Sequence, residues 1–127
     1  MADGCCRVLE GHTSDVHRCK FSPDGRWLAT AGGDGTVRVW RAADGGSVAR
    51  LDGRKDPFYG IAFSADSSRL AAVGDDFMLR VWSTEGFRPV FAKRLARDAL
   101  YAVTFCPDRG SLALGGAETD VVIQVVE

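Results

Sequence analysis

The sequence predicts an all-β protein built from about three copies of one four-stranded antiparallel unit, and two observations support this prediction. The first is an internal repeat, because Phe21, Phe63 and Phe105 follow one another at intervals of 42 residues and each precedes a turn-like sequence. A period near 42 fits a unit of four short strands. The second is the alternation of side chains in short runs, separated by turns that contain many of the 15 glycines.

The strands of each unit can be placed in order from these signals. The first strand ends in the repeated phenylalanine, and alternation puts His17, Cys19 and Phe21 on one face of it. A Pro-Asp-Gly-like turn then reverses the chain. The second strand is rich in small residues and is expected at 27–31, 69–73 and 111–115. A tight turn at Asp34-Gly35 leads to the third strand, expected at 37–40 and 79–82, and a plainer fourth strand is expected around 47–51 and 89–92.

These residues resemble the WD40-repeat family, whose units form the blades of β-propellers. The resemblance is specific in the first unit and weaker in the next two, and it rests on Gly11-His12, Phe21-Ser-Pro-Asp-Gly25, Leu28-Ala-Thr30, Asp34 and Val37-Arg-Val-Trp40. It implies a single domain over 1–127 with WD40-type β-propeller blades at about 11–51, 53–92 and 95–127. Residues 5–10 are expected to form a stray outer strand.

The resemblance also implies a structural hydrogen-bond tetrad within a blade, which is matched here by His12, Thr30, Asp34 and Trp40. Only Asp76 and Trp82 remain of it in the second unit, where Arg54 and Ala72 occupy the other two positions. The competing interpretation is a nucleophilic relay, which would need an exposed hydroxyl beside the histidine and an oxyanion hole. The sequence suggests neither, so we expect no catalytic residues and no enzyme activity.

Three blades are too few to close a propeller, which typically has four to eight. We therefore expect an incomplete ring with two uncovered sheet faces. The third unit ends where its third strand should finish, and the N-terminal strand could complete the last blade of another copy. Two accounts stay open: a homo-oligomer, most simply a six-bladed dimer, or part of a longer propeller with a structural role.

The resemblance places partner contacts at three positions per blade on one end of the propeller. In the 42-residue register these candidates are Asp15, His17, Gly33, Pro57, Tyr59, Asp75, Ala99, Tyr101 and Ala117. A protein or peptide partner is the leading expectation, and the chain would then be an interaction scaffold. The alternative for His17, Tyr59 and Tyr101 is that they only pack around the narrow end of the channel. An enzyme subunit is the third and weakest function class.

Composition argues against nucleic acid, membranes and metal ions as further partners. The formal net charge is −1, so no basic excess points to nucleic acid, and the apolar runs are too short to cross a bilayer. The four cysteines have neither zinc-ligand nor disulfide-framework spacing. His12 and His17 do not share a strand face, so no metal and no cofactor is expected. We expect an intracellular, cytoplasmic protein, with the nucleus as the other compartment.

Overall fold

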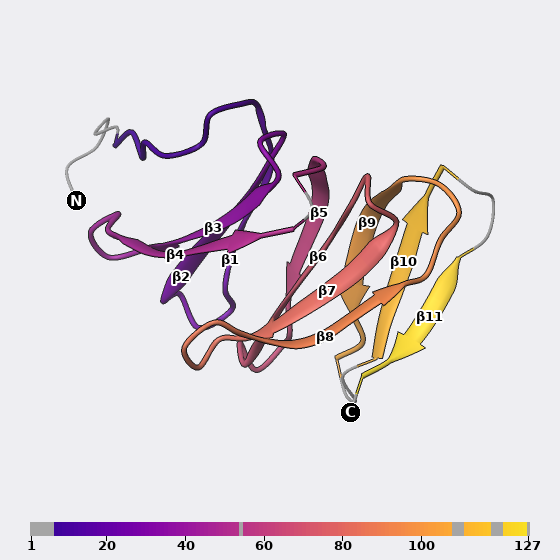
Figure 1. Ribbon diagram of the computed structural model, residues 1–127. Coiled ribbons are helices and arrows are strands. Elements are labelled where there is room, and N and C mark those ends of the chain that lie inside the picture. Colours follow the sequence, from indigo (N-terminus) through magenta and orange to yellow (C-terminus); the bar gives the residue numbers. More distant parts are fainter. Residues whose placement is uncertain (1–6, 54, 108–110, 118–120, 127) are drawn as a thin grey trace.

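The structure, a computed structural model, describes residues 7–53, 55–107, 111–117 and 121–126 and shows three antiparallel sheets that follow one another in chain order (Figure 1). Sheet 1 contains β1 (Val16–Phe21), β2 (Trp27–Gly32), β3 (Thr36–Arg41) and β4 (Ser47–Asp52). Sheet 2 contains β5 (Phe58–Phe63), β6 (Arg69–Gly74), β7 (Met78–Ser83) and β8 (Arg88–Arg94). Sheet 3 contains β9 (Leu100–Phe105), β10 (Ser111–Gly116) and β11 (Val122–Val125).

The all-β prediction and the repeat of four-stranded units are confirmed. Within sheets 1 and 2, consecutive strands are neighbours, and β1, β5 and β9 begin 42 residues apart, as do β2, β6 and β10. Sheet 3 has three strands within the described residues, which agrees with the expectation that the third unit lacks its fourth strand. The inner strands β1, β5 and β9 contact one another in sequence and line the same side of the molecule.

Short polar turns fix the reversal after each inner strand. The Ser22 hydroxyl donates to the Asp24 carboxylate over 2.6 Å, and Gly25 supplies a positive φ of 76°. The second unit uses the same device, because the carboxylate of Asp66 accepts from neighbouring serines. There Ser67 takes the φ of 64°. Small side chains that bond to their own turn stabilise this conformation without glycine.

The core consists of two apolar layers between neighbouring sheets. The layer between sheets 1 and 2 contains Ala29, Ala31, Val37, Val39, Phe58, Ile61, Leu70 and Ala72. The layer between sheets 2 and 3 contains Ala71, Val73, Leu79, Val81, Leu100, Phe105, Leu112 and Leu114. At the first of these interfaces, Trp27 also meets Phe87 edge-to-face at 5.5 Å between ring centroids. Each sheet is therefore stabilised mainly by burial against its neighbour.

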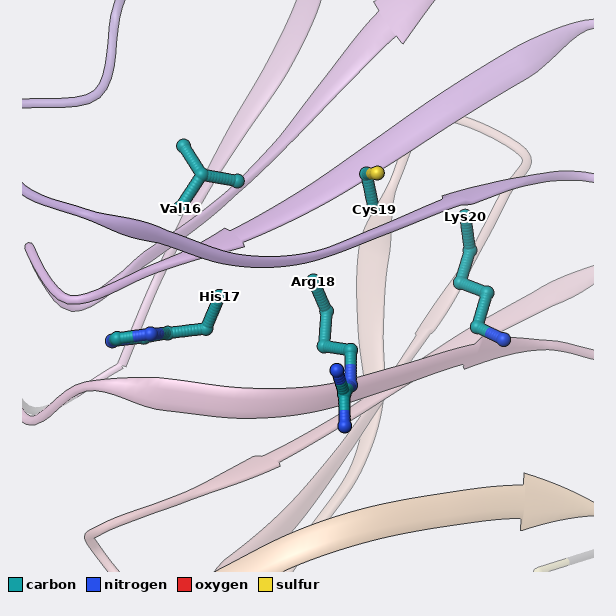
Figure 2. Close-up of a pocket in the computed structure, with 5 residues that line it drawn as sticks. All are labelled: Val16, His17, Arg18, Cys19 and Lys20. Carbon is teal, nitrogen blue, oxygen red and sulfur yellow. The ribbon is translucent and has the colours of Figure 1, made fainter.

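Each inner strand carries one β-bulge at the same repeat position. In β1 the pairing passes from Val16–Gly32 directly to Arg18–Ala31, so His17 is the extra residue. The equivalent extra residues are Tyr59 in β5 and Tyr101 in β9. A bulge redirects the side chain it carries. Figure 2 shows the result in β1, where His17 points to the side opposite Cys19. The prediction that alternation puts these two on one face is therefore wrong, because the bulge breaks the alternation.

The chain segment before sheet 1 also differs from the prediction. Residues 7–10 lie outside any strand, and residues 5 and 6 lie outside the described residues. A strand needs a free edge to pair with, and the free edge of β11 is at the opposite end of the molecule (Figure 1). Leu9 instead lies with Phe21 and Leu28 around an apolar pocket of about 170 Å³ on the outer face of sheet 1.

A glycine lies opposite the bulge region in every sheet, and in sheet 3 this is Gly116, which pairs with Leu100. A Cβ on Gly116 would collide with the carbonyl oxygen of Ala99 and lie 2.9 Å from the Leu100 Cα. A Cβ on the adjacent Gly115 would meet nothing within 4 Å. The backbone of the inner strand thus approaches the second strand too closely for any side chain at position 116.

We expect Gly116→Ala to lower the free energy of unfolding by roughly 1–3 kcal/mol, because the clash is with backbone atoms that can only move by distorting the bulge. The neighbouring Gly115→Ala is the matched control and should change it by less than about 0.5 kcal/mol. Urea denaturation of both variants measures the difference. Equal stability of the two variants would contradict this account of the bulge.

Candidate functional site

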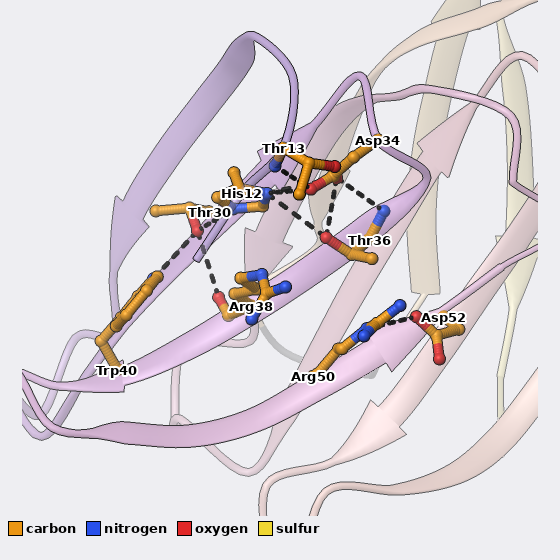
Figure 3. Close-up of polar contacts among 9 residues, drawn as sticks. All are labelled: His12, Thr13, Thr30, Asp34, Thr36, Arg38, Trp40, Arg50 and Asp52. Carbon is orange, nitrogen blue, oxygen red and sulfur yellow. Dashed lines mark hydrogen bonds and ion pairs between the residues drawn. The ribbon is translucent and has the colours of Figure 1, made fainter. Parts of the chain in front are cut away.

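Four of the residues singled out in the sequence meet in one chain of hydrogen bonds within sheet 1 (Figure 3). The indole N–H of Trp40 donates to the Thr30 hydroxyl oxygen over 3.0 Å. That oxygen lies 2.7 Å from Nε2 of His12, and Nδ1 of His12 lies 3.1 Å from the carboxylate of Asp34. The contacts link the segment before β1 to β2, to the β2–β3 turn and to β3.

The donors and acceptors of this tetrad are mutually consistent. Thr30 accepts from Trp40 and can donate its own proton to Nε2 of His12, which leaves Nδ1–H to donate to Asp34. This order of protons requires the Nδ1–H tautomer of the histidine. Because every member has a partner, burial of the group carries no penalty for an unpaired polar atom.

Asp34 receives more hydrogen bonds than the tetrad alone supplies. Its carboxylate also accepts from the backbone N–H of Thr13 at 2.9 Å, from the N–H of Thr36 at 3.1 Å and from the Thr36 hydroxyl at 2.8 Å. Burial by itself would raise the pKa of Asp34, but the bonds from Thr13, Thr36 and His12 outweigh it and hold the pKa at about 2. The contribution of Thr13 and Thr36 was not predicted, although an Asp two residues before a strand is a known turn signal.

This geometry differs from that of a nucleophilic relay. The side chains of His12 and Asp34 are only 6% and 4% exposed, Thr30 is buried, and its oxygen already accepts from Trp40. A nucleophile must reach a substrate and must face an oxyanion site. The arrangement favours a brace that joins strands and turn.

The second unit retains a different polar contact at the same place. Asp76 accepts from the guanidinium of Arg80 at 3.0 and 3.3 Å, and both side chains are largely buried. Trp82 is buried next to this position, but Ala72 offers it no hydroxyl. The predicted counterpart of the histidine, Arg54, lies outside the described residues. Sheet 2 therefore keeps the buried carboxylate and indole, and an arginine from β7 neutralises the carboxylate.

The candidate partner positions gather at one end of the three inner strands. Three equivalent backbone hydrogen bonds hold them together, from Gly33 N–H to the Asp15 carbonyl, from Asp75 to Pro57 and from Ala117 to Ala99, at 2.8, 3.0 and 3.0 Å. Of these candidates, Ala99 is buried, so its side chain is not available to a partner. We call the other eight the end face: Asp15, His17, Gly33, Pro57, Tyr59, Asp75, Tyr101 and Ala117.

The bulge residues form a continuous row of aromatic rings on the end face. The ring centroids of His17 and Tyr59 are 5.2 Å apart, and those of Tyr59 and Tyr101 are also 5.2 Å apart. We call these three residues the aromatic ladder. Tyr101 is 46% exposed at its end. The pKa of Tyr59 is raised, mainly by burial and further by the nearby Asp75 carboxylate. The ladder thus places ring surface next to a negative charge.

The channel side of β1 differs from the end face in charge. An open pocket there is lined by Val16, His17, Arg18, Cys19 and Lys20 (Figure 2). Arg18 and Lys20 point to the same side as His17. Within the described residues no group of three potential ligands could hold a metal ion, and no helix there is long and apolar enough to span a membrane.

Comparisons with known proteins agree with this fold. The family model described as "WD domain, G-beta repeat" matches residues 3–41 and 45–83. The solved chains "Structure of U3-55K" and "Crystal structure of RRP9 WD40 repeats" each superpose with a TM-score of 0.90 at 20% identity, over 94% of this chain and 38% of theirs. At that identity they show the fold alone.

Curated relatives match over single stretches. "Ribosome biogenesis protein ERB1" of Debaryomyces hansenii is 43% identical over 44 residues, which is 35% of this chain and 5% of that protein. "WD40 repeat-containing protein HOS15" of Arabidopsis thaliana is 46% identical over 48 residues, which is 38% of this chain and 8% of that protein. The chain therefore spans only a small part of the length of these relatives.

Proposed function

The chain belongs to the WD40-repeat family, and from this premise we propose that it is a non-enzymatic scaffold whose end face binds a protein or peptide partner. The aromatic ladder is the observation that carries the proposal. Tyrosine rings that are held in place and remain accessible are typical anchors of protein interfaces. The rings arise at bulges, where the side chains leave the packed layers between sheets.

Charge indicates which partner segment fits the end face. Two of its eight residues, Asp15 and Asp75, are carboxylates, and none is lysine or arginine. An arginine or lysine of the partner could lie against a ring of the ladder and pair with a carboxylate. We therefore propose that the partner presents an extended segment with a basic side chain.

The test is a titration of the protein with two short peptides that differ only in one side chain, arginine or its neutral analogue citrulline. We expect the NMR signals of Tyr59 and Tyr101 to give a Kd for the arginine peptide that is at least about tenfold lower than for the citrulline peptide. The reason is that only arginine gains the charged contacts. Asp75→Asn should reduce this preference. Tyr101→Ala should weaken binding of both peptides.

The matched control is Val90→Ala on β8, an exposed apolar position outside the end face. It should leave both titrations unchanged. If Tyr101→Ala binds both peptides as tightly as Val90→Ala does, or if arginine is not preferred, this function of the end face is ruled out. In that case the ladder only packs around the narrow end of the channel.

A second candidate, a structural part of a larger propeller, is favoured by the uncovered outer faces of sheets 1 and 3.

Several curated relatives are named for ribosome biogenesis. We propose that this chain lies inside the cell, in the cytoplasm or in the nucleus. Microscopy of a tagged chain would decide between the two compartments.

A further inference from the structure

The bulge in β1 brings charged side chains next to the aromatic ladder. Residues that follow one another in a regular strand point to opposite sides. His17 and Arg18 nevertheless point to the same side, because the bulge redirects His17 (Figure 2). Lys20 is two residues further along β1 and also points to this side. We call Arg18 and Lys20 the basic pair, which lies on the channel side of β1 beyond the end face.

The charges of the basic pair have no counter-charge nearby. Both residues are exposed, and among the residues that the structure describes neither side chain forms a hydrogen bond or an ion pair. The strands β1, β5 and β9 contain no aspartate and no glutamate. The residues equivalent to the basic pair in β5 and β9 are short and uncharged: Gly60, Ala62, Ala102 and Thr104. The first unit alone therefore places positive charge at this position of its inner strand.

The basic pair is on the side of β1 that faces β5. His17, which points the same way, packs against Tyr59 of β5. Val16 and Cys19 point to the opposite side (Figure 2). The counterpart of Cys19 in sheet 2 is Ile61, which lies in the layer between that sheet and the one before it. A sheet placed ahead of β1 would thus cover the side of Cys19 and leave the basic pair open to the channel.

Charges of opposite sign are therefore separated along β1 and the end face. The end face carries the carboxylates Asp15 and Asp75 and no lysine or arginine, whereas the basic pair borders an open pocket of about 470 Å³. A partner with only basic side chains would be repelled by the basic pair, but a carboxylate would be attracted to both of its charges. Complementary charges across a contact also fix the register of the partner.

We infer that the basic pair binds an acidic side chain, aspartate or glutamate, of the same extended segment whose basic side chain lies on the end face. This inference rests on the proposed function and adds the second charge and the register of the partner. Side chains on one side of an extended segment recur at every second residue, about 7 Å apart. The acidic residue is therefore expected two or four residues away from the basic one.

The test uses short peptides that contain one arginine and, two or four residues from it on either side, a glutamate or a glutamine. Calorimetric titration of the protein with each peptide gives the Kd. We expect at least one glutamate peptide to bind about threefold to tenfold more tightly than its glutamine analogue, which is the effect of one or two exposed ion pairs. This preference should shrink as the salt concentration is raised, because exposed charges are screened.

The variant Arg18→Gln with Lys20→Gln should bind the glutamate and glutamine peptides equally, since it removes both charges of the basic pair. The matched control is Arg88→Gln with Lys93→Gln, which removes one arginine and one lysine from exposed positions of β8. This control should bind each peptide as the parent does.

The inference is overturned if the parent prefers no glutamate peptide, or if the preference survives in Arg18→Gln with Lys20→Gln. A short single-stranded RNA that binds the parent but not this variant, without any glutamate preference, would overturn it in favour of nucleic acid. The proposed function has a separate readout, which is the preference for arginine over citrulline. Loss of that preference alone contradicts the proposed function of the end face, and loss of the glutamate preference alone contradicts the role of the basic pair.

Discussion

Trp40→Ala is expected to lower the free energy of unfolding by roughly 3–5 kcal/mol. The indole is 4% exposed and forms part of the interior of sheet 1. Its removal leaves a cavity and takes away the N–H that donates to Thr30. Denaturation by urea, followed by circular dichroism, measures the change. An unchanged unfolding midpoint would mean that the tetrad does not support the fold.

Sheet 2 provides the control for the hydrogen bond itself. Trp82 is buried to the same degree, but the position equivalent to Thr30 in sheet 2 is Ala72, which has no hydroxyl. Trp40→Phe should therefore cost about 1 kcal/mol more than Trp82→Phe, since only the first change removes the bond to the threonine. If the two phenylalanine variants lose equal stability, the tetrad acts through packing and not through its polar contacts.

The second large effect concerns Asp34→Asn, which we expect to cost about 2 kcal/mol at pH 7. The ordinary pKa of the carboxyl is 3.8, and in the fold it is held at about 2. Each pKa unit corresponds to about 1.4 kcal/mol, so the shift from 3.8 to about 2 stabilises the charged form by about 2 kcal/mol. An amide retains an oxygen acceptor, but the bonds from Thr13 and Thr36 weaken because the charge is lost.

The pH dependence follows from the sign of this shift. Because the folded pKa lies below the unfolded one, the unfolded chain binds more protons between pH 4 and pH 2. The stabilisation by Asp34 is complete above about pH 4 and disappears as the pH falls through about 2. The stability difference between the parent and Asp34→Asn should therefore shrink across this window.

The matched control is Asp52→Asn, because Asp52 pairs with Arg50 on the surface with both side chains more than half exposed. Exposed pairs contribute little, so this variant should follow the parent at every pH. A stability difference for Asp34→Asn that stays constant from pH 7 to pH 2 would show that the cost is steric and not electrostatic.

Most of the fold could be predicted because its signals are local and recur. Alternation, turn residues and the interval of 42 residues placed all the strands of sheets 1 and 2 and the first two strands of sheet 3. The residues of the tetrad could be placed because the first unit matches the WD40 pattern closely. The structure brings all four together, while their effect on stability stays a prediction.

The orientation of the bulge residues could not be predicted. Strict alternation put His17 with Cys19, and the structure separates them because β1 contains one residue more than its partner strand in that stretch. A bulge leaves no mark in the hydrophobic pattern, since it changes the pairing between two strands and not the composition of either one. The pairing of Asp76 with Arg80 could not be predicted either. Arg80 comes from β7, whereas the histidine that contacts the aspartate in sheet 1 lies before β1.

The bulges also bear on how such a chain can change over evolutionary time. In the regular part of the inner strand β5, Phe58 and Ile61 are buried in the layer between sheets 1 and 2, so replacements there affect stability. The extra residue of a bulge stands outside the ladder of strand pairs. The first unit has histidine at this position and the other two have tyrosine. Selection can therefore alter the end face here one residue at a time while the sheets beneath it remain intact.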